Sequence, residues 1–123
     1  MKVLIVEDDT VLSLLISRMI ERLGYTVTGV VSKGREAVTK IKQLKPDLIL
    51  MDIMLEDDLD GINAIYEVRE ESINTPVIFI TGNSDPYNKD RAKETKYIDY
   101  LIKPITFNEL TLSIEKIPFF DKL

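Results

Sequence analysis

Short apolar runs alternate with longer segments in which apolar residues recur at every third or fourth position. The short runs predict buried strands, and the longer spacing predicts amphipathic helices. The predicted strands are Val3–Val6, Thr26–Val30, Leu48–Met51, Val77–Ile80 and Tyr100–Ile102. Strands that alternate with helices in this way indicate an α/β fold built on a parallel sheet.

Five helices are predicted between and after these strands. The first runs from Thr10 to Leu23 and is expected to turn four residues to the core: Leu12, Leu15, Met19 and Leu23. The others lie between Ser32 and Pro46, after the cap Asp60, over Tyr87–Lys96 behind Ser84 or Asp85, and between Thr106 and Pro118. The Tyr87–Lys96 segment has little apolar content, so we expect it to be the least firmly held helix.

Polar residues stand directly after four of the predicted strands. They are Glu7-Asp8, Asp52, Thr81 and Lys103-Pro104. The carboxyl ends of parallel strands meet at one edge of an open sheet, where such folds bind ligands. Each residue alone is commonly a helix cap, a turn residue or a solvated lysine, but the ordered set predicts three carboxylates, a hydroxyl and an ammonium in one crevice.

This set of side chains suits a divalent cation and a phosphoryl group. Three carboxylates within about 5 Å would repel by roughly 3 kcal/mol per pair at an effective dielectric near 20. A hard cation such as Mg²⁺ among the oxygens would relieve that repulsion. An aspartate, with Asp52 as the candidate, can attack phosphorus while the metal and a lysine neutralise charge. Lys-Pro at a strand end also predicts a cis bond at Lys103-Pro104, which would aim the lysine into the crevice.

Composition narrows the range of functions further. A chain of 123 residues has the length of one domain, and its net charge of -5 argues against direct nucleic acid binding. The apolar runs are too short for a membrane span and no signal peptide is visible, so a cytoplasmic protein is expected. The sequence holds neither cysteine nor histidine, which excludes disulfides, Ser-His and Cys-His catalysis and imidazole metal sites.

The segments VLIVEDD, DLILMDIML with DGI, VIFITG and YLIKP resemble the receiver (CheY-like) domain of two-component response regulators. The resemblance runs from Lys2 to about Ile117. It implies a flavodoxin-like, doubly wound sheet of five parallel strands in the order 2-1-3-4-5 with five helices. We therefore expect residues 1–123 to form a single receiver domain, with no output domain in this chain.

The same resemblance implies roles for individual residues. Asp52 is the phosphoacceptor, while Thr81 and Lys103 bind the phosphoryl group. The metal ligands are Asp8, Asp52, the backbone carbonyl of Met54 and, through water, Glu7. Tyr100 occupies the position of an aromatic switch.

The resemblance further implies a phosphorylation-dependent signalling switch rather than an enzyme with an external substrate. Such a domain catalyses only its own phosphoryl transfer and dephosphorylation, with Mg²⁺ or Mn²⁺ as cofactor. Its partners would be a sensor histidine kinase or a phosphotransfer protein. A homodimer or output contact would use the face formed by the fourth helix, the fifth strand and the fifth helix.

One loop departs from the family pattern and leaves alternatives open. Many receivers have a proline soon after the phosphoacceptor, whereas this chain reads Leu55-Glu56-Asp57-Asp58. The run from Glu56 to Gly61, with Glu67 six residues later, nearly fits an EF-hand calcium loop. A third possibility is a receiver-like fold that serves as a binding module without phosphorylation.

Overall fold

Strands and helices alternate along the described chain. The computed structural model describes residues 1–82 and 85–118. The strands are β1 Lys2–Val6, β2 Thr26–Val31, β3 Leu48–Met51, β4 Val77–Thr81 and β5 Asp99–Ile102. The helices are α1 Thr10–Arg22, α2 Gly34–Leu44, α3 Gly61–Glu70, α4 Pro86–Ala92 and α5 Phe107–Glu115, and a 3-10 turn, η1, covers Lys93–Thr95.

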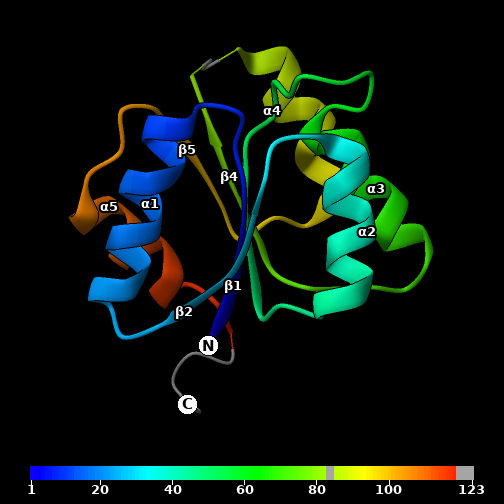
Figure 1. Cartoon of the computed structure of the whole chain (residues 1–123). Helices are drawn as coiled ribbons and strands as arrows, with labels where there is room; N and C mark the ends of the chain where they lie inside the picture. Colours follow the sequence, from blue (N-terminus) through cyan, green and yellow to red (C-terminus); the bar gives the residue numbers. More distant parts are fainter. Residues whose placement is uncertain (83–84, 119–123) are drawn as a thin grey trace.

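The strands form one parallel sheet in the order β2-β1-β3-β4-β5. This is the flavodoxin-like order that the resemblance implied, and the prediction is confirmed. Figure 1 shows α1 and α5 on one face of the sheet and α2, α3 and α4 on the other. Because the strands are parallel, their carboxyl ends share one edge of the sheet.

Alternate residues of the central strands fill two cores, one on each face of the sheet. Leu4, Ile49 and Phe79 belong to the core covered by α2 and α3. Ile5 and Ile78 belong to the core shared with α1 and α5. All five side chains are fully buried, and burying one such side chain contributes about 1.5–3 kcal/mol. The carboxyl edge of the sheet therefore rests on a firmly packed base.

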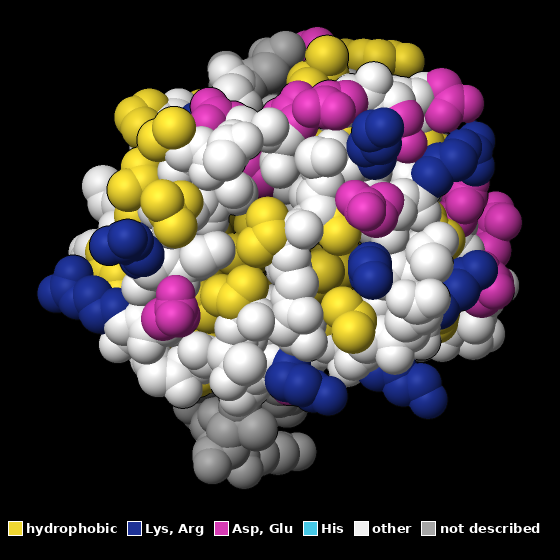
Figure 2. All heavy atoms as spheres, in the orientation of Figure 1, with side chains coloured by type: hydrophobic (Ala, Val, Ile, Leu, Met, Phe, Trp, Pro, Cys, Tyr) yellow, Lys and Arg dark blue, Asp and Glu magenta, His cyan; other side chains and the backbone are white. Residues whose placement is uncertain are grey.

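The inward face of α1 differs from the prediction at one position. The expectation that Leu15 lies in the core is wrong, because its side chain is 50% exposed and Ile16 and Ile20 are buried instead. The other predicted core residues are partly buried beside them: Leu12, Met19 and Leu23. Val11 and Leu14 are also exposed, and Figure 2 shows hydrophobic side chains on the side of the molecule where α1 lies. Apolar residues lie on more than one side of α1. The three-and-four spacing alone therefore does not decide which of these residues face the sheet.

The segment after β4 forms a shorter helix than predicted. A single helix over Tyr87–Lys96 was expected, but α4 ends at Ala92 and the chain continues as η1 to Thr95. Lys96 then adopts a left-handed conformation, with φ of 57°. Ala92 is the one buried residue of α4. Little apolar packing therefore holds this helix, in agreement with its low apolar content.

Most helices begin behind a residue that caps them. Asp9, Asp60 and Asp85 accept hydrogen bonds from backbone N–H groups of α1, α3 and α4. Thr106 and Glu109 form a capping box at the start of α5. Ser84, the alternative cap for α4, lies outside the described residues. Within the described ranges, no helix has the length and apolar content needed to cross a membrane.

Candidate functional site

The polar residues that follow the strands lie together at the carboxyl edge of the sheet. Backbone hydrogen bonds continue past the strand ends: Asp52 N donates to Val6 O at 2.9 Å, and Lys103 N donates to Thr81 O at 2.8 Å. Asp52 and Lys103 are therefore held by hydrogen bonds to the neighbouring strands. Figure 2 shows acidic side chains gathered along the upper edge, where these strands end.

Three carboxylates form a compact group at this edge. Glu7, Asp8 and Asp52 each place an oxygen within 4.8 Å of the others. Glu7 and Asp52 are buried, with side chains 2% and 4% exposed. Burial raises the pKa of Asp8, and the hydrogen bond and negative charge of Glu7 raise it further. An all-oxygen group of like charges fits a hard divalent cation such as Mg²⁺.

Lys103 supplies a cation inside this acidic group. Its Nζ lies 2.8 Å from Glu7 Oε1 and 3.1 Å from Asp52 Oδ2. Burial alone would lower the pKa of Lys103, but the contacts with Glu7 and Asp52 outweigh it and raise the pKa. The ammonium therefore stays charged at neutral pH. The peptide bond between Lys103 and Pro104 is cis, as the Lys-Pro pair at the strand end predicted.

Thr81 and Tyr100 lie on the neighbouring strands β4 and β5. Thr81 is the last residue of β4 and is buried. The Tyr100 ring packs against Phe79 and Tyr97, at centroid distances of 6.1 and 5.8 Å. Its hydroxyl is buried and has no hydrogen-bond partner among residues 1–82 and 85–118. Burial raises the pKa of Tyr100, and the nearby Tyr97 and Asp85 raise it further. An unpaired buried hydroxyl leaves this ring less firmly held than a satisfied one.

The loop after β3 is tied to α2 by an aspartate whose role the sequence did not indicate. Asp57 Oδ1 accepts from Gly34 N at 2.9 Å, and its Oδ2 accepts from Arg35 N at 3.0 Å. Burial would raise the pKa of Asp57, but the backbone N–H donors outweigh it and lower the pKa. These residues are 23 and 22 positions apart, so no local motif could have revealed the contact. In the same loop, Met54 is 65% exposed.

The acidic loop does not have the arrangement of an EF-hand. Both Asp57 oxygens bind backbone N–H groups of α2, and Asp60 caps α3 while pairing with Arg91 at 2.9 Å. Among residues 1–82 and 85–118, the acidic group close enough to share a metal ion is Glu7, Asp8 and Asp52. The calcium-loop alternative is therefore contradicted.

The family model for the response regulator receiver domain matches residues 3–115. The chain belongs to this family. The receiver fold accounts for the sheet order described above, and members of the family act in phosphorylation-dependent signalling. The resemblance drawn from the strand-end motifs is therefore confirmed.

Two relatives differ in how much of their own length this chain covers. The chain is 33% identical over 92% of its length to a probable C4-dicarboxylate response regulator, DctR, of Halalkalibacterium halodurans, covering 49% of that protein. It is 31% identical to the chemotaxis protein CheY of Thermotoga maritima, over 94% of this chain and 96% of that protein. The receiver domain thus spans about half of the first relative and nearly all of the second.

Solved structures agree with this assignment. The signal receiver domain of a modulated diguanylate cyclase from Desulfovibrio desulfuricans superposes with a TM-score of 0.84 at 40% identity, covering 93% of this chain and 90% of that one. A Francisella response regulator receiver domain superposes with a TM-score of 0.82 at 33% identity, with 93% of each chain covered. Both similarities extend over almost the whole receiver domain.

Proposed function

We propose that this receiver domain accepts a phosphoryl group on Asp52 from a histidine kinase or a phosphotransfer protein. The observation that carries the proposal is the ion pairing of one ammonium, Lys103, with both Glu7 and Asp52 inside the acidic group. Such a group is unfavourable as a structural core, because it gathers three negative charges around one positive charge. It suits a site where more negative charge arrives with a phosphoryl group and a cation.

In the proposed transfer, the protein has two tasks: to position Asp52 against the phosphorus atom and to neutralise the charge on the phosphoryl oxygens. An oxygen of Asp52 forms a bond to phosphorus, the P–N bond to the donor imidazole breaks, and its electron pair stays on the imidazole nitrogen. Lys103 is 3.1 Å from Asp52 Oδ2, so its charge can follow the phosphoryl oxygens. The Thr81 hydroxyl, at the end of β4, is assigned as a hydrogen-bond donor to one of them.

We place a metal site at the same edge because of the oxygen donors that gather there. Asp8, Asp52 and the backbone carbonyl of Met54 would bind Mg²⁺ or Mn²⁺ directly, with Glu7 acting through water. Bound there, the cation would neutralise phosphoryl charge that Lys103 alone does not balance. The close approach of the three carboxylates supports this assignment.

The proposed output is a change of the face formed by α4, β5 and α5. Phosphorylation would draw Thr81 toward the site and alter the packing of Tyr100. α4 buries only Ala92 and is held by polar contacts from Arg91: a salt bridge to Asp60, and the Arg91 backbone oxygen bound by the Tyr66 hydroxyl. If two positions of α4 differ little in free energy, a few kcal/mol supplied by phosphorylation would shift the population from one position to the other. We assign an output partner or a second copy of the chain to this face, in the cytoplasm.

The test of the acceptor is intact-mass measurement after incubation with acetyl phosphate and Mg²⁺. One added phosphoryl group is expected in the native protein, with none in Asp52→Asn or in native protein treated with a chelator. Asp47→Asn, which changes an aspartate at the opposite end of β3, is the matched control and should be labelled normally. Equal labelling of Asp52→Asn would refute the acceptor, and no labelling of any form would favour the binding module.

The test of the output face uses beryllofluoride, which mimics an aspartyl phosphate. Amide NMR shifts should extend from Asp52 through Thr81 to residues 86–103. In Thr81→Ala the shifts near Asp52 should remain while those of α4 and β5 weaken. Shifts confined to the immediate surroundings of Asp52 in the native protein would contradict the proposed switch.

A further inference from the structure

A cavity of about 740 Å³ lies at the opposite edge of the sheet from the carboxylate group. Pro76 and Ile98, at the amino ends of β4 and β5, form part of its wall, and Pro118 forms another part. Ligand pockets commonly enclose about 300–1,000 Å³. The cavity therefore has room for a small molecule and shares no residue with the proposed phosphorylation site.

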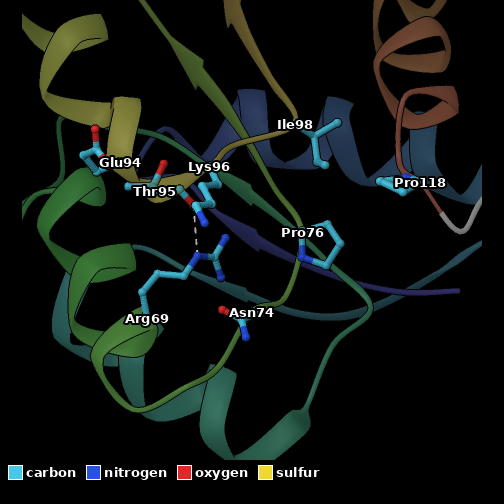
Figure 3. Close-up of a pocket in the computed structure, with 8 residues that line it drawn as sticks. All are labelled: Arg69, Asn74, Pro76, Glu94, Thr95, Lys96, Ile98 and Pro118. Carbon is cyan, nitrogen blue, oxygen red and sulfur yellow. Dashed lines mark hydrogen bonds between the residues drawn. The ribbon is translucent and has the colours of Figure 1, made fainter.

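Arg69 is the anchoring side chain of this cavity. Its Nε donates to Thr95 O at 3.0 Å, and its Nη1 donates to Ile73 O at 3.0 Å. Figure 3 shows the guanidinium held beneath η1, between Thr95 on one side and Asn74 on the other. The two carbonyls fix the plane of the guanidinium and leave further N–H donors for a ligand.

No carboxylate of the described residues neutralises this guanidinium. Arg69 takes part in none of the ion pairs found within residues 1–82 and 85–118. Burial lowers the pKa of Arg69. A half-buried, oriented cation without a counter-charge is a favourable place for an oxyanion.

The remaining wall adds charge on one side and apolar surface on the other. Lys96 and Arg69 are opposed by a single acid, Glu94, so the lining is net positive in a protein with net charge -5. Pro76 and Ile98 offer apolar surface in the same cavity. A ligand that satisfies both parts would carry an anionic head and an apolar body.

We propose that this cavity binds a small organic anion, with a carboxylate or phosphate head at Arg69 and Lys96 and an apolar or aromatic body against Pro76, Ile98 and Pro118. The N–H donors of Arg69 that the two carbonyls leave unused, on Nη1 and Nη2, bind the two oxygens of the head. The site is independent of phosphorylation at Asp52.

The test is an amide NMR titration of the whole chain with benzoate, AMP and the neutral benzyl alcohol. Benzoate or AMP should give saturable shifts at Arg69, Asn74 and residues 95–98, and the two anions distinguish a carboxylate from a phosphate head. Benzyl alcohol should bind about tenfold more weakly, as expected when hydrogen bonds to a charged group are lost. No saturable shift from either anion at millimolar concentration, or equal binding of the alcohol, would overturn the proposal.

A pair of lysine variants isolates the contribution of the cavity from general charge. Lys96 and Lys45 both end a helical segment in a left-handed conformation, with φ of 57° and 46°, and both are exposed. Asparagine tolerates that conformation. Lys96→Asn should weaken benzoate or AMP binding several-fold and Lys45→Asn should leave it unchanged, whereas equal binding by the two would count against the site.

Two further variants separate this proposal from loss of folding and from the proposed function. Arg69→Gln should abolish the shifts, and its amide spectrum shows directly whether the chain is folded. Should Arg69→Gln fail to fold, the comparison of the two lysine variants decides. Asp52→Asn should bind the anion as the native protein does, so the two proposals stand or fall separately.

Discussion

A Cβ atom at Gly61 would lie 2.0 Å from the backbone oxygen of Asp52. The glycine begins α3, and its N–H donates to Ile53 O at 2.9 Å. Helix α3 can therefore start directly against the residues that hold the proposed phosphoacceptor only while position 61 has no side chain. The position of Asp52 is thus set by a packing contact as well as by the sheet.

Gly61→Ala should destabilise the fold and slow phosphorylation together. Forcing a methyl group against backbone atoms typically costs about 1–3 kcal/mol, and relief requires the Asp52 segment to move. Urea unfolding and the rate of labelling by acetyl phosphate measure the two effects. Gly82→Ala is the matched control, since a Cβ atom there meets no atom of the described residues within 4 Å. Equal stability of the two variants would contradict this account.

Asp8→Asn should stabilise the metal-free protein by about 1 kcal/mol, because one of three mutually repelling charges is removed at a partly exposed position. With Mg²⁺ present, the native protein should be more stable than Asp8→Asn, since it gains binding energy that the variant lacks. Thermal unfolding with chelator and with Mg²⁺ gives both values. Asp9→Asn keeps the cap of α1 and should behave as native under both conditions; a similar loss of the Mg²⁺ effect there would weaken the assignment.

Asp57→Ala should lower the free energy of unfolding by about 1 kcal/mol, the usual effect of losing a helix cap. The reason is that Gly34 N and Arg35 N lose their acceptor. Asp58→Ala should change little, because its pair with Arg35 spans 3.4 Å between side chains that are 63% and 76% exposed. Urea unfolding compares the two. Loss of Mg²⁺ binding in Asp57→Ala alone, with Asp8→Asn still binding, would revive the calcium-loop alternative.

Asp99 should contribute to stability above pH 4 and lose that contribution in acid. Burial would raise the pKa of Asp99, but hydrogen bonds from Ser113 and Lys116 outweigh it and lower the pKa below its ordinary 3.8. For an acid with a lowered pKa in the folded state, stability is present above the ordinary value and is lost as pH falls through the lowered one. In Asp99→Asn, the free energy of unfolding should fall less steeply as the pH drops below 4. Asp90→Asn, at an exposed position of α4, should lose stability in acid as the native protein does.

Tyr100→Phe should keep or raise stability, since the hydroxyl that it removes is buried with no hydrogen-bond partner in the part of the chain that the structure describes. Relief of such a group is worth up to about 1–3 kcal/mol. Tyr66→Phe removes a hydroxyl that donates to Arg91 O, so it should destabilise by about 1 kcal/mol. Guanidinium unfolding of both variants provides the comparison. A clear loss of stability in Tyr100→Phe would show that the hydroxyl has a role that the packing does not reveal.

The strand-end residues could be predicted from sequence because each follows a run of buried apolar residues. Parallel pairing then leaves one geometry for Glu7, Asp52, Thr81 and Lys103, whatever the details of the helices. The direct pairing of Lys103 with Glu7 was harder to predict, since the sequence gives no distance between side chains on outer and inner strands. The geometry supports the assigned roles, which labelling and metal titration will test.

The spacing of apolar residues gave a wrong prediction where two sides of a helix are similarly apolar. Leu15 and Ile16 are both apolar, and only the position of the sheet selects the second for the core. Likewise, Asp57 caps a helix that begins 23 residues earlier in the sequence. After α4 the chain continues as η1, which ends at a left-handed Lys96, a conformation that lysine does not signal.

The ion pairs of Lys103 join the last strand of the sheet to residues that follow the first and third strands. A nascent or cleaved chain that lacks β5 carries the acidic residues but not the ammonium that balances them. If Asp52 accepts a phosphoryl group as proposed, such a fragment lacks the lysine that would follow the phosphoryl oxygens, however well its earlier strands are formed. The proposed phosphorylation would therefore depend on the last strand being synthesised and folded, and incomplete molecules would respond poorly to the signal.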